Sequence, residues 1–427
     1  MPPVRASLVI AVYFSALARE LQAAQLARPW SFLQARVAGQ PQPEYLREEV
    51  KSNKTYVDAR DKDVEAVWAN PRLLNRQRHA DHPWRKISGA DTDGARTLCI
   101  DGKLVPELYV LGAQKAATSS LSEDLVDAGV ESKGDTVDMN PKEFHFFDAN
   151  LDWKHASLAL GIENGRERWL KHLPDCTWES HRVLADFTPD SLRMVPVPKG
   201  IRASGQFPPW RARPSGEADM PVVLKTFYGA AAPRISFVTL LRSPLSRMQS
   251  AWYAAKACNN FGCICLSCKA DSFHAALDAH LTRALSTGEV SDWIWASMYG
   301  PHLKRWLEVF SAKQMMVVPY KQYVEGDKDA ICRDLFGRLR FAVDCASTRS
   351  ASRAWATEKT ELSVDAGELR PKFHGFMRPF NEELVSVLAQ AHADGASLAN
   401  FAGAREASAS GSEEARDSIK KWLFKSW

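Results

Sequence analysis

The sequence predicts a three-layer α/β fold, in which helices flank a central, mostly parallel β-sheet. Two stretches carry this prediction. Residues 106–129 (PELYVLGAQKAATSSLSEDLVDAG) read as a short apolar strand, a turn of small residues and a helix. Residues 235–253 (ISFVTLLRSPLSRMQSAWY) repeat that order, with a strand that is apolar on both faces. From Leu104 onward strand and helix patterns alternate, which is typical of parallel sheets.

Composition indicates a globular, enzyme-sized protein. The 427-residue chain is 45% hydrophobic and contains 14 Trp and 19 Phe, enough to bury one large core or two modest ones. Its net charge of +4 is too small to indicate a nucleic-acid partner, although it leaves room for a local basic cleft. Composition and charge therefore do not determine the function, and the sequence motifs carry that information.

The N-terminus indicates the secretory pathway. Arg5 precedes a 13-residue apolar run over residues 6–18, whose last three residues (ALA) resemble a cleavage site. A transmembrane helix needs about 20 apolar residues. Residues 1–25 are therefore expected to be a signal peptide or a short signal-anchor, with a buried N-terminal helix as the alternative. Asn53 begins the only N-x-S/T sequon, which is consistent with a luminal route.

Eight cysteines fit an oxidising compartment. Four of them cluster over residues 258–268 (CNNFGCICLSC), where disulfides are favoured over zinc because C-x-C is not the usual paired C-x2-C spacing of zinc sites. Cys332 and Cys345 are candidates for closing a second small loop. The sequence does not determine the connectivity.

The strand–turn–helix of residues 106–129 has the outline of an anion site. A helix N-terminus offers N–H groups and a positive dipole end, and Lys115 in the turn adds a full charge. A nucleoside-triphosphate P-loop needs G-x4-G-K-[ST]. Here Gln114 precedes the lysine and Ala116 follows it, so the hydroxyl that binds Mg²⁺ is missing. The turn therefore predicts phosphate binding of a kind that differs from ordinary ATPases.

Residues 140–148 (NPKEFHFFD) are the candidate position of a general base. Read as an extended segment, they place Glu143 and His145 on one face and Phe144 and Phe146 on the other. Two proton-handling side chains would then be mounted on a buried aromatic face. The alternative is an edge strand whose polar face meets water.

A short strand over residues 183–185 ends in DFTP (186–189), and a long basic loop follows over residues 193–221. A loop of this length is usually functional or disordered. It would bind an acidic substrate or form a solvated insertion. Its cations are Arg193, Lys199, Arg202, Arg211 and Arg213.

The second strand–helix element places Arg242 where its strand ends. Ser243 is a good N-cap and Pro244 a good first helical residue. Ser250 lies two turns along the same helix face as Ser243. Arg242 and Ser250 are thus expected at the edge where α/β sheets bind ligands. The alternative is a buried arginine that pairs with a carboxylate.

The remaining elements complete the domain. We expect an amphipathic helix over residues 299–310, with Leu303, Trp306, Leu307 and Phe310 facing inward. The other expected elements are a strand over 315–318, a helix over 373–388 with Pro379 near its start, and a docked terminal helix around 422–424. The predicted divisions are an N-terminal stem over 26–104, the catalytic domain over 105–400 and a tail over 401–427.

Together these motifs resemble those of PAPS-dependent sulfotransferases, in particular the luminal, Golgi-type branch that acts on carbohydrates such as heparan sulfate. GAQKAATSSL resembles the family's 5′-phosphosulfate loop, LLRSPLSRMQSAWY its 3′-phosphate strand and helix, and KEFHFFD the segment that supplies the catalytic base. DFTP, YGPHLKRWLEVF and FMRPFNEEL resemble later blocks. The resemblance spans residues 105–390, with the blocks in the right order.

The resemblance implies a P-loop-like fold, PAPS as sulfate donor, no metal, and a glycan or glycoconjugate acceptor in the Golgi lumen or outside the cell. It implies membrane contact only through an uncleaved N-terminal segment. Glu143 would take the acceptor's proton, Lys115 would stabilise the leaving phosphate, and His145 would assist or contact the acceptor. The implied donor contacts are Lys115, Ala116, Ala117, Thr118, Ser119 and Ser120 for the phosphosulfate and Arg242 and Ser250 for the 3′-phosphate; the candidate acceptor contacts are Lys142, His145, Arg211 and Arg213.

The chain departs from the family in three places. The family commonly has Gly where Ala117 stands, its late basic loop is represented only by Arg353 and Lys359 as candidates, and the cysteine cluster matches no family block. Three alternatives remain open: sulfation of protein tyrosine or a small alcohol, a non-catalytic glycan- or PAP-binding protein, and a P-loop nucleotide kinase. Acceptor identity and the choice between O- and N-sulfation are not determined by the sequence.

Overall fold

The computed structural model describes twelve segments of the chain, and the statements below concern these residues. They are residues 85–86, 97–132, 143–144, 146–147, 162–171, 173–177, 181–198, 201–203, 219–259, 270–345, 369–403 and 412–424. The expected signal segment, most of the stem, the cysteines at 263–268, and Lys142, His145, Lys199, Arg211, Arg213, Arg353 and Lys359 lie outside them.

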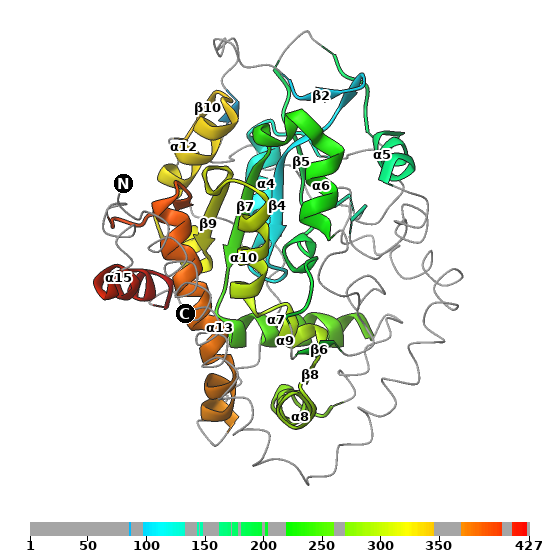
Figure 1. Cartoon of the computed structure of the whole chain (residues 1–427). Coiled ribbons are helices and arrows are strands. Elements are labelled where there is room, and N and C mark those ends of the chain that lie inside the picture. Colours follow the sequence, from blue (N-terminus) through cyan, green and yellow to red (C-terminus); the bar gives the residue numbers. More distant parts are fainter. Residues whose placement is uncertain are drawn as a thin grey trace, which may run out of the picture.

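A five-stranded sheet in the order β11-β9-β7-β4-β5 forms the centre of the fold (Figure 1). Every neighbouring pair is parallel. All residues of the four longer strands are buried, because helices cover both faces. The predicted α/β class with a parallel sheet is therefore confirmed. The strands are β4 (Pro106–Gly112), β5 (Leu184–Asp186), β7 (Ser236–Leu241), β9 (Met315–Pro319) and β11 (Ser397–Leu398).

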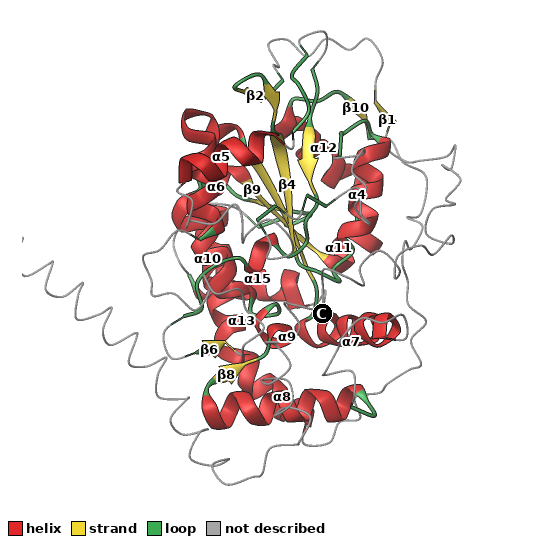
Figure 2. Ribbon diagram, turned by 90° about the vertical axis from the view of Figure 1, so that its right-hand side faces the viewer, coloured by secondary structure: helices red, strands yellow, loops and turns green. Residues whose placement is uncertain are grey.

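Helices form a layer on each side of the sheet, as Figure 2 shows. On one side lie α5 (Ile162–Lys171), α6 (Met220–Tyr228) and α10 (Tyr299–Val309). On the other lie α4 (Thr118–Asp127), α11 (Tyr320–Glu325) and α12 (Lys328–Leu339). The Phe237 ring of β7 contacts Trp306 of α10 with centroids 5.2 Å apart. This contact confirms the inward face predicted for α10.

A third group of helices lies beyond the carboxyl ends of the strands (Figures 1 and 2). It consists of α7 (Pro244–Asn259), α8 (Phe273–Thr287) and α9 (Asp292–Trp295), together with a short parallel pair formed by β6 (Arg202–Ala203) and β8 (Glu289–Val290). Three 3-10 turns complete the described connections, η2 (Ser191–Arg193), η4 (Gly229–Arg234) and η6 (Ala312–Gln314). Within the basic loop predicted over 193–221, the structure describes residues 193–198, 201–203 and 219–221, which include β6 and the first two residues of α6.

Two helices close the C-terminal part. α13 (Leu369–Ala393) begins four residues before the predicted helix, so Pro379 lies inside it and not near its start. α15 (Glu413–Phe424) packs against α13, and its Trp422 indole donates to the Ala399 carbonyl over 2.9 Å. The predicted docked terminal helix is therefore confirmed, and it is longer than the apolar cluster alone indicated.

Among the described residues, two disulfides close loops. Cys332–Cys345 confirms one predicted pair. Cys99–Cys176 joins residues 77 positions apart and was not predicted. It ties the antiparallel hairpin of β2 (Cys99–Ile100) and β3 (Lys103–Leu104) to the segment after α5. A second antiparallel pair joins β1 (Arg85–Lys86) to β10 (Val343–Asp344). The two disulfides fit an oxidising secretory compartment. Among the described helices, none combines the length and apolar character needed to cross a membrane.

Candidate functional site

The turn between β4 and α4 has the geometry of an anion site. Lys115 and Ala117 have φ angles of 68° and 73°, in the left-handed region that costs non-glycine residues about 1 kcal/mol each. Ala117 is the N-cap of α4 and provides no side-chain hydrogen bond, and the first turn carries no acidic residue. The N–H groups at a helix start need partners from outside the helix. The positive φ explains why a glycine is expected where Ala117 stands.

Gly112 fits the strand end closely against the segment after β5. Its φ is +139°, and a Cβ there would lie 2.4 Å from the Pro189 carbonyl oxygen. The backbone at Gly112 thus passes close to the Pro189 carbonyl, where a side chain would have no room. This contact gives a conformational and a steric reason for glycine at this position.

Gly112→Ala should destabilise the fold strongly. We expect a loss of about 2–5 kcal/mol, because backbone strain and overpacking add. Gly375→Ala is the matched control: Gly375 lies in α13, and a methyl group there would meet no atom within 4 Å, so this variant should be neutral or stabilised by up to about 1 kcal/mol. Urea unfolding of the three proteins measures both effects. Equal stability of the two variants would contradict the close fit at Gly112.

Strand register brings the two predicted anion elements together. Gly112 pairs with Thr239 of β7, and the Ala113 N–H donates to the Leu240 carbonyl over 2.8 Å. One step further, Arg242 Nη1 donates to the Lys115 carbonyl over 2.9 Å. The residues joined by this bond are 127 positions apart in the chain. Strand register therefore brings Lys115 and Arg242, which were predicted from two separate motifs, to the same edge of the sheet.

Arg242 is a half-buried cation that no described carboxylate contacts. Its guanidinium carbon lies 4.6 Å from the centre of the Tyr320 ring, and the Tyr299 hydroxyl donates to its carbonyl over 2.9 Å. Burial lowers the pKa of Arg242, because it penalises the charged form and only the two tyrosines oppose it. The alternative of an arginine paired with a carboxylate finds no support among these residues. An anion bound here would offset the cost of burying the charge.

Ser250 lies in the helix that follows Arg242 directly. α7 begins at Pro244, as predicted, and Ser250 is only 5% exposed. Arg247 of the same helix donates to Ser297 Oγ and to the Trp293 carbonyl, each over 2.6 Å, and so ties α7 to the segment around α9. Ser250 is therefore mounted on a rigid element beside the edge that carries Arg242.

The candidate base lies at the same edge, on the β5 side. Glu143 is partly buried, and the next residue, Phe144, donates its N–H to Asp186 Oδ1 over 3.4 Å. Asp186 ends β5 and also accepts the N–H and the hydroxyl of Thr188, over 2.9 and 2.6 Å. Because β5 neighbours β4, this contact brings Glu143 to the carboxyl edge of the sheet. The sequence did not reveal the anchoring by Asp186.

The extended segment predicted over residues 140–148 is described only at residues 143–144 and 146–147, where Phe144 and Phe146 are buried as expected and Glu143 is partly buried. The segment departs from a strand at Phe146 and Phe147, which form a bend and are both buried. The Phe147 ring lies 5.9 Å from Phe227 of α6 and 6.4 Å from Trp169 of α5. The aromatic anchor is therefore formed by consecutive residues that a bend turns inward.

Arg193 does not serve as a substrate-binding cation of the basic loop. It pairs with Asp190 over 2.9 Å and with Asp292 of α9, and its side chain is 15% exposed. These two carboxylates neutralise the charge of Arg193 within the protein. Arg193 therefore joins η2 to α9 and has a structural role.

Comparison with known proteins finds similarity among solved structures. No protein-family model and no curated protein matches the chain. Among solved structures, the chain is similar to a sulfotransferase from Alicyclobacillus acidocaldarius. The identity is 15% and the TM-score 0.37, with 66% of this chain and 96% of that chain covered.

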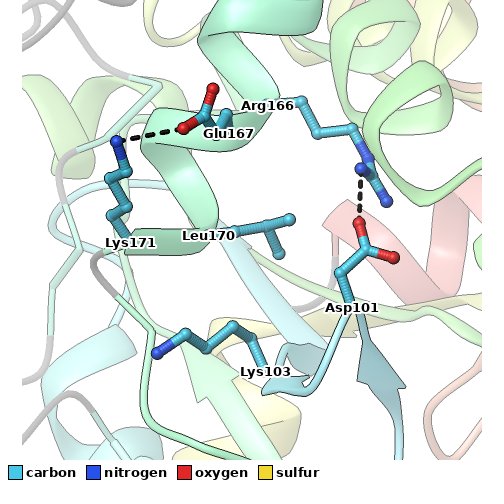
Figure 3. A pocket seen from close by; sticks show the side chains of 6 residues that line it. All are labelled: Asp101, Lys103, Arg166, Glu167, Leu170 and Lys171. Atoms are coloured by element: carbon cyan, nitrogen blue, oxygen red, sulfur yellow. Dashed lines mark hydrogen bonds and ion pairs between the residues drawn. The ribbon is translucent and has the colours of Figure 1, made fainter.

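A pocket at the opposite end of the sheet has a different character. Figure 3 shows it between the β2–β3 hairpin and α5, with Leu170 among its lining residues. Its cations each have a carboxylate partner: Arg166 with Asp101 over 2.7 Å, Lys171 with Glu167 over 3.0 Å and Lys103 with Asp175 over 2.6 Å. The pocket therefore lacks the unpaired charge of Arg242. Among the described side chains, no group of three or more His, Cys, Asp or Glu is arranged to hold a metal ion.

Proposed function

We propose that this protein is a sulfotransferase that moves a sulfuryl group from PAPS to a hydroxyl or amine of a carbohydrate. The observation that carries the proposal is Arg242. It is a half-buried cation without a described carboxylate partner, and it is hydrogen-bonded to the carbonyl of Lys115 in a second anion-binding element. A donor that carries two separate anionic groups matches such a pair.

The described residues fit the two anionic ends of PAPS. Lys115, Ala116, Ala117 and the first turn of α4 (Thr118, Ser119 and Ser120) would bind the 5′-phosphosulfate at a helix N-terminus. Arg242 and Ser250 would bind the 3′-phosphate, for which the planar guanidinium fork is well suited. Charge complementarity and the family-like motifs therefore support the same donor.

The chain's residues would act mainly by positioning and by stabilising charge. PAPS would supply an activated sulfuryl group attached to a phosphate leaving group. Glu143 would take the proton from the attacking hydroxyl or amine, which a general base must do within hydrogen-bonding reach. Lys115 would stabilise the negative charge that develops on the leaving phosphate. His145, Lys142, Arg211 and Arg213 stay predictions for the acceptor side.

The carbohydrate acceptor rests on the family resemblance of KEFHFFD and YGPHLKRWLEVF. A luminal or secreted location fits the two disulfides and the N-terminal apolar run. We place the protein in the Golgi lumen or outside the cell on this basis.

The test is transfer from sulfur-labelled PAPS to a panel of glycans, tyrosine peptides and small alcohols, with a metal chelator present. We expect label on a glycan hydroxyl or amine. Label on peptides or alcohols would replace the carbohydrate acceptor but keep the reaction class. Binding of PAP without transfer to any acceptor would indicate a non-catalytic protein. Metal-dependent transfer of phosphate from ATP would indicate a kinase.

A further inference from the structure

One short helix, α11, contacts both proposed anion-binding elements. It follows β9 directly, and because Leu241 of β7 pairs with Pro319 of β9, Arg242 and Tyr320 continue side by side beyond the sheet. One turn later, the Tyr323 hydroxyl donates to Asp124 Oδ2 on α4. α11 thus contacts Arg242 through Tyr320 at its start, and it contacts α4, the helix proposed to bind the phosphosulfate, through Tyr323 near its middle.

The contact between α11 and α4 is a buried polar cluster. Tyr323 is 1% exposed, Asp124 4% and Lys328 9%. Lys328 Nζ lies 3.5 Å from Asp124 Oδ2 and 4.5 Å from the centre of the Tyr323 ring. Burial and the Asp124 carboxylate raise the pKa of Tyr323 well above its ordinary value, so its hydroxyl keeps its proton and donates. Burying such a cluster is costly unless its polar groups stay paired with one another. The pairing therefore favours one relative position of α4 and α11.

These contacts form a closed circuit. It runs from Lys115 through α4 to Asp124, across to Tyr323, along α11 to Tyr320, and through Arg242 back to the Lys115 carbonyl. Asp124 lies six residues after Thr118, about 9 Å along the helix axis. The bond from Tyr323 therefore fixes the far part of α4 relative to the element that carries Arg242.

We propose that Tyr323 and Asp124 are positioning residues that set the spacing between the two anion-binding elements, so that both ends of one bisphosphate bind at once. This inference rests on the proposed function. Two linked groups bind more tightly than either alone only if the spacing of their sites matches the ligand. A shift of α4 would therefore weaken a bisphosphate more than either monophosphate.

The test is the variant Tyr323→Phe, which removes the hydroxyl and keeps the ring over which Lys328 lies. Affinity is measured for adenosine 3′,5′-bisphosphate, adenosine 5′-monophosphate and adenosine 3′-monophosphate. We expect about tenfold weaker binding of the bisphosphate and less than about twofold change for each monophosphate.

Tyr228→Phe is the matched control. It also removes a buried tyrosine hydroxyl, one that donates to the Pro106 carbonyl over 2.6 Å at the opposite end of β4. It should lose comparable stability without separating the bisphosphate from the monophosphates. Equal weakening of all three ligands in Tyr323→Phe, or no weakening, would overturn the proposal.

A ligand-free measurement separates this inference from the proposed function. Amide hydrogen exchange over residues 113–121 should be faster in Tyr323→Phe than in the wild type and in Tyr228→Phe. If the wild type does not bind the bisphosphate, the proposed function fails, and this exchange difference alone decides the positioning role. Unchanged exchange in Tyr323→Phe would then overturn it.

Discussion

Glu143→Gln should abolish sulfuryl transfer while the protein still binds adenosine 3′,5′-bisphosphate. Glutamine keeps the size of the side chain and its hydrogen-bonding capacity, but it cannot accept the acceptor's proton. Loss of a general base typically costs 10²- to 10⁴-fold in rate, on the order of 3–5 kcal/mol of barrier. The expected result is a large loss of kcat with an unchanged dissociation constant for the bisphosphate.

Turnover with labelled PAPS and isothermal titration with the bisphosphate measure the two quantities. Glu167→Gln is the control, because Glu167 is an exposed carboxylate at the far pocket, paired with Lys171 over 3.0 Å. It should leave transfer unchanged. Near-normal turnover in Glu143→Gln would refute the assignment of the base.

Arg242→Met should remove bisphosphate binding without destabilising the free protein. The lost charge-assisted contact should weaken binding by at least about 30-fold, which corresponds to roughly 2 kcal/mol. In the free protein, the hydrogen bond to the Lys115 carbonyl is lost, but so is the cost of burying a cation that no described carboxylate pairs with. We therefore expect an unliganded Tm equal to or above that of the wild type, and no shift on adding ligand.

Arg193→Met is the matched control for the free protein. Arg193 is likewise only partly exposed, but it pairs with Asp190 and Asp292, so its replacement removes a cation from two carboxylates. This should cost about 3–5 kcal/mol of unfolding free energy. If Arg242→Met lowers the unliganded Tm as much as Arg193→Met does, Arg242 is a structural cation and the anion site is wrongly placed.

Local patterns were sufficient for most elements around the site. β4, β7 and β9 are short apolar runs because a parallel sheet buries both faces, and such runs stand out in a sequence. The Ser–Pro start of α7 and the amphipathic face of α10 were predicted correctly because capping residues and helical periodicity are also local signals. The bend at Phe146–Phe147 was missed, because partners distant in sequence, on α5 and α6, determine which aromatic rings turn inward.

The sequence by itself thus predicted four of the five strands of the central sheet, β4, β5, β7 and β9, and it singled out Lys115, Glu143, Arg242 and Ser250 as candidate site residues. It did not predict β11 or the β2–β3 hairpin. The tertiary structure decided which of them meet: the bond from Arg242 to Lys115 follows from the register of β4 and β7, and the Asp186 carboxylate at the end of β5 accepts the N–H of Phe144, next to Glu143. It also decided that Arg193 forms ion pairs within the protein and that α11 contacts both proposed anion-binding elements. The physical reason is that apolar period and turn chemistry act over a few residues. Pairing between distant residues depends on how whole strands and helices align, which no local pattern records.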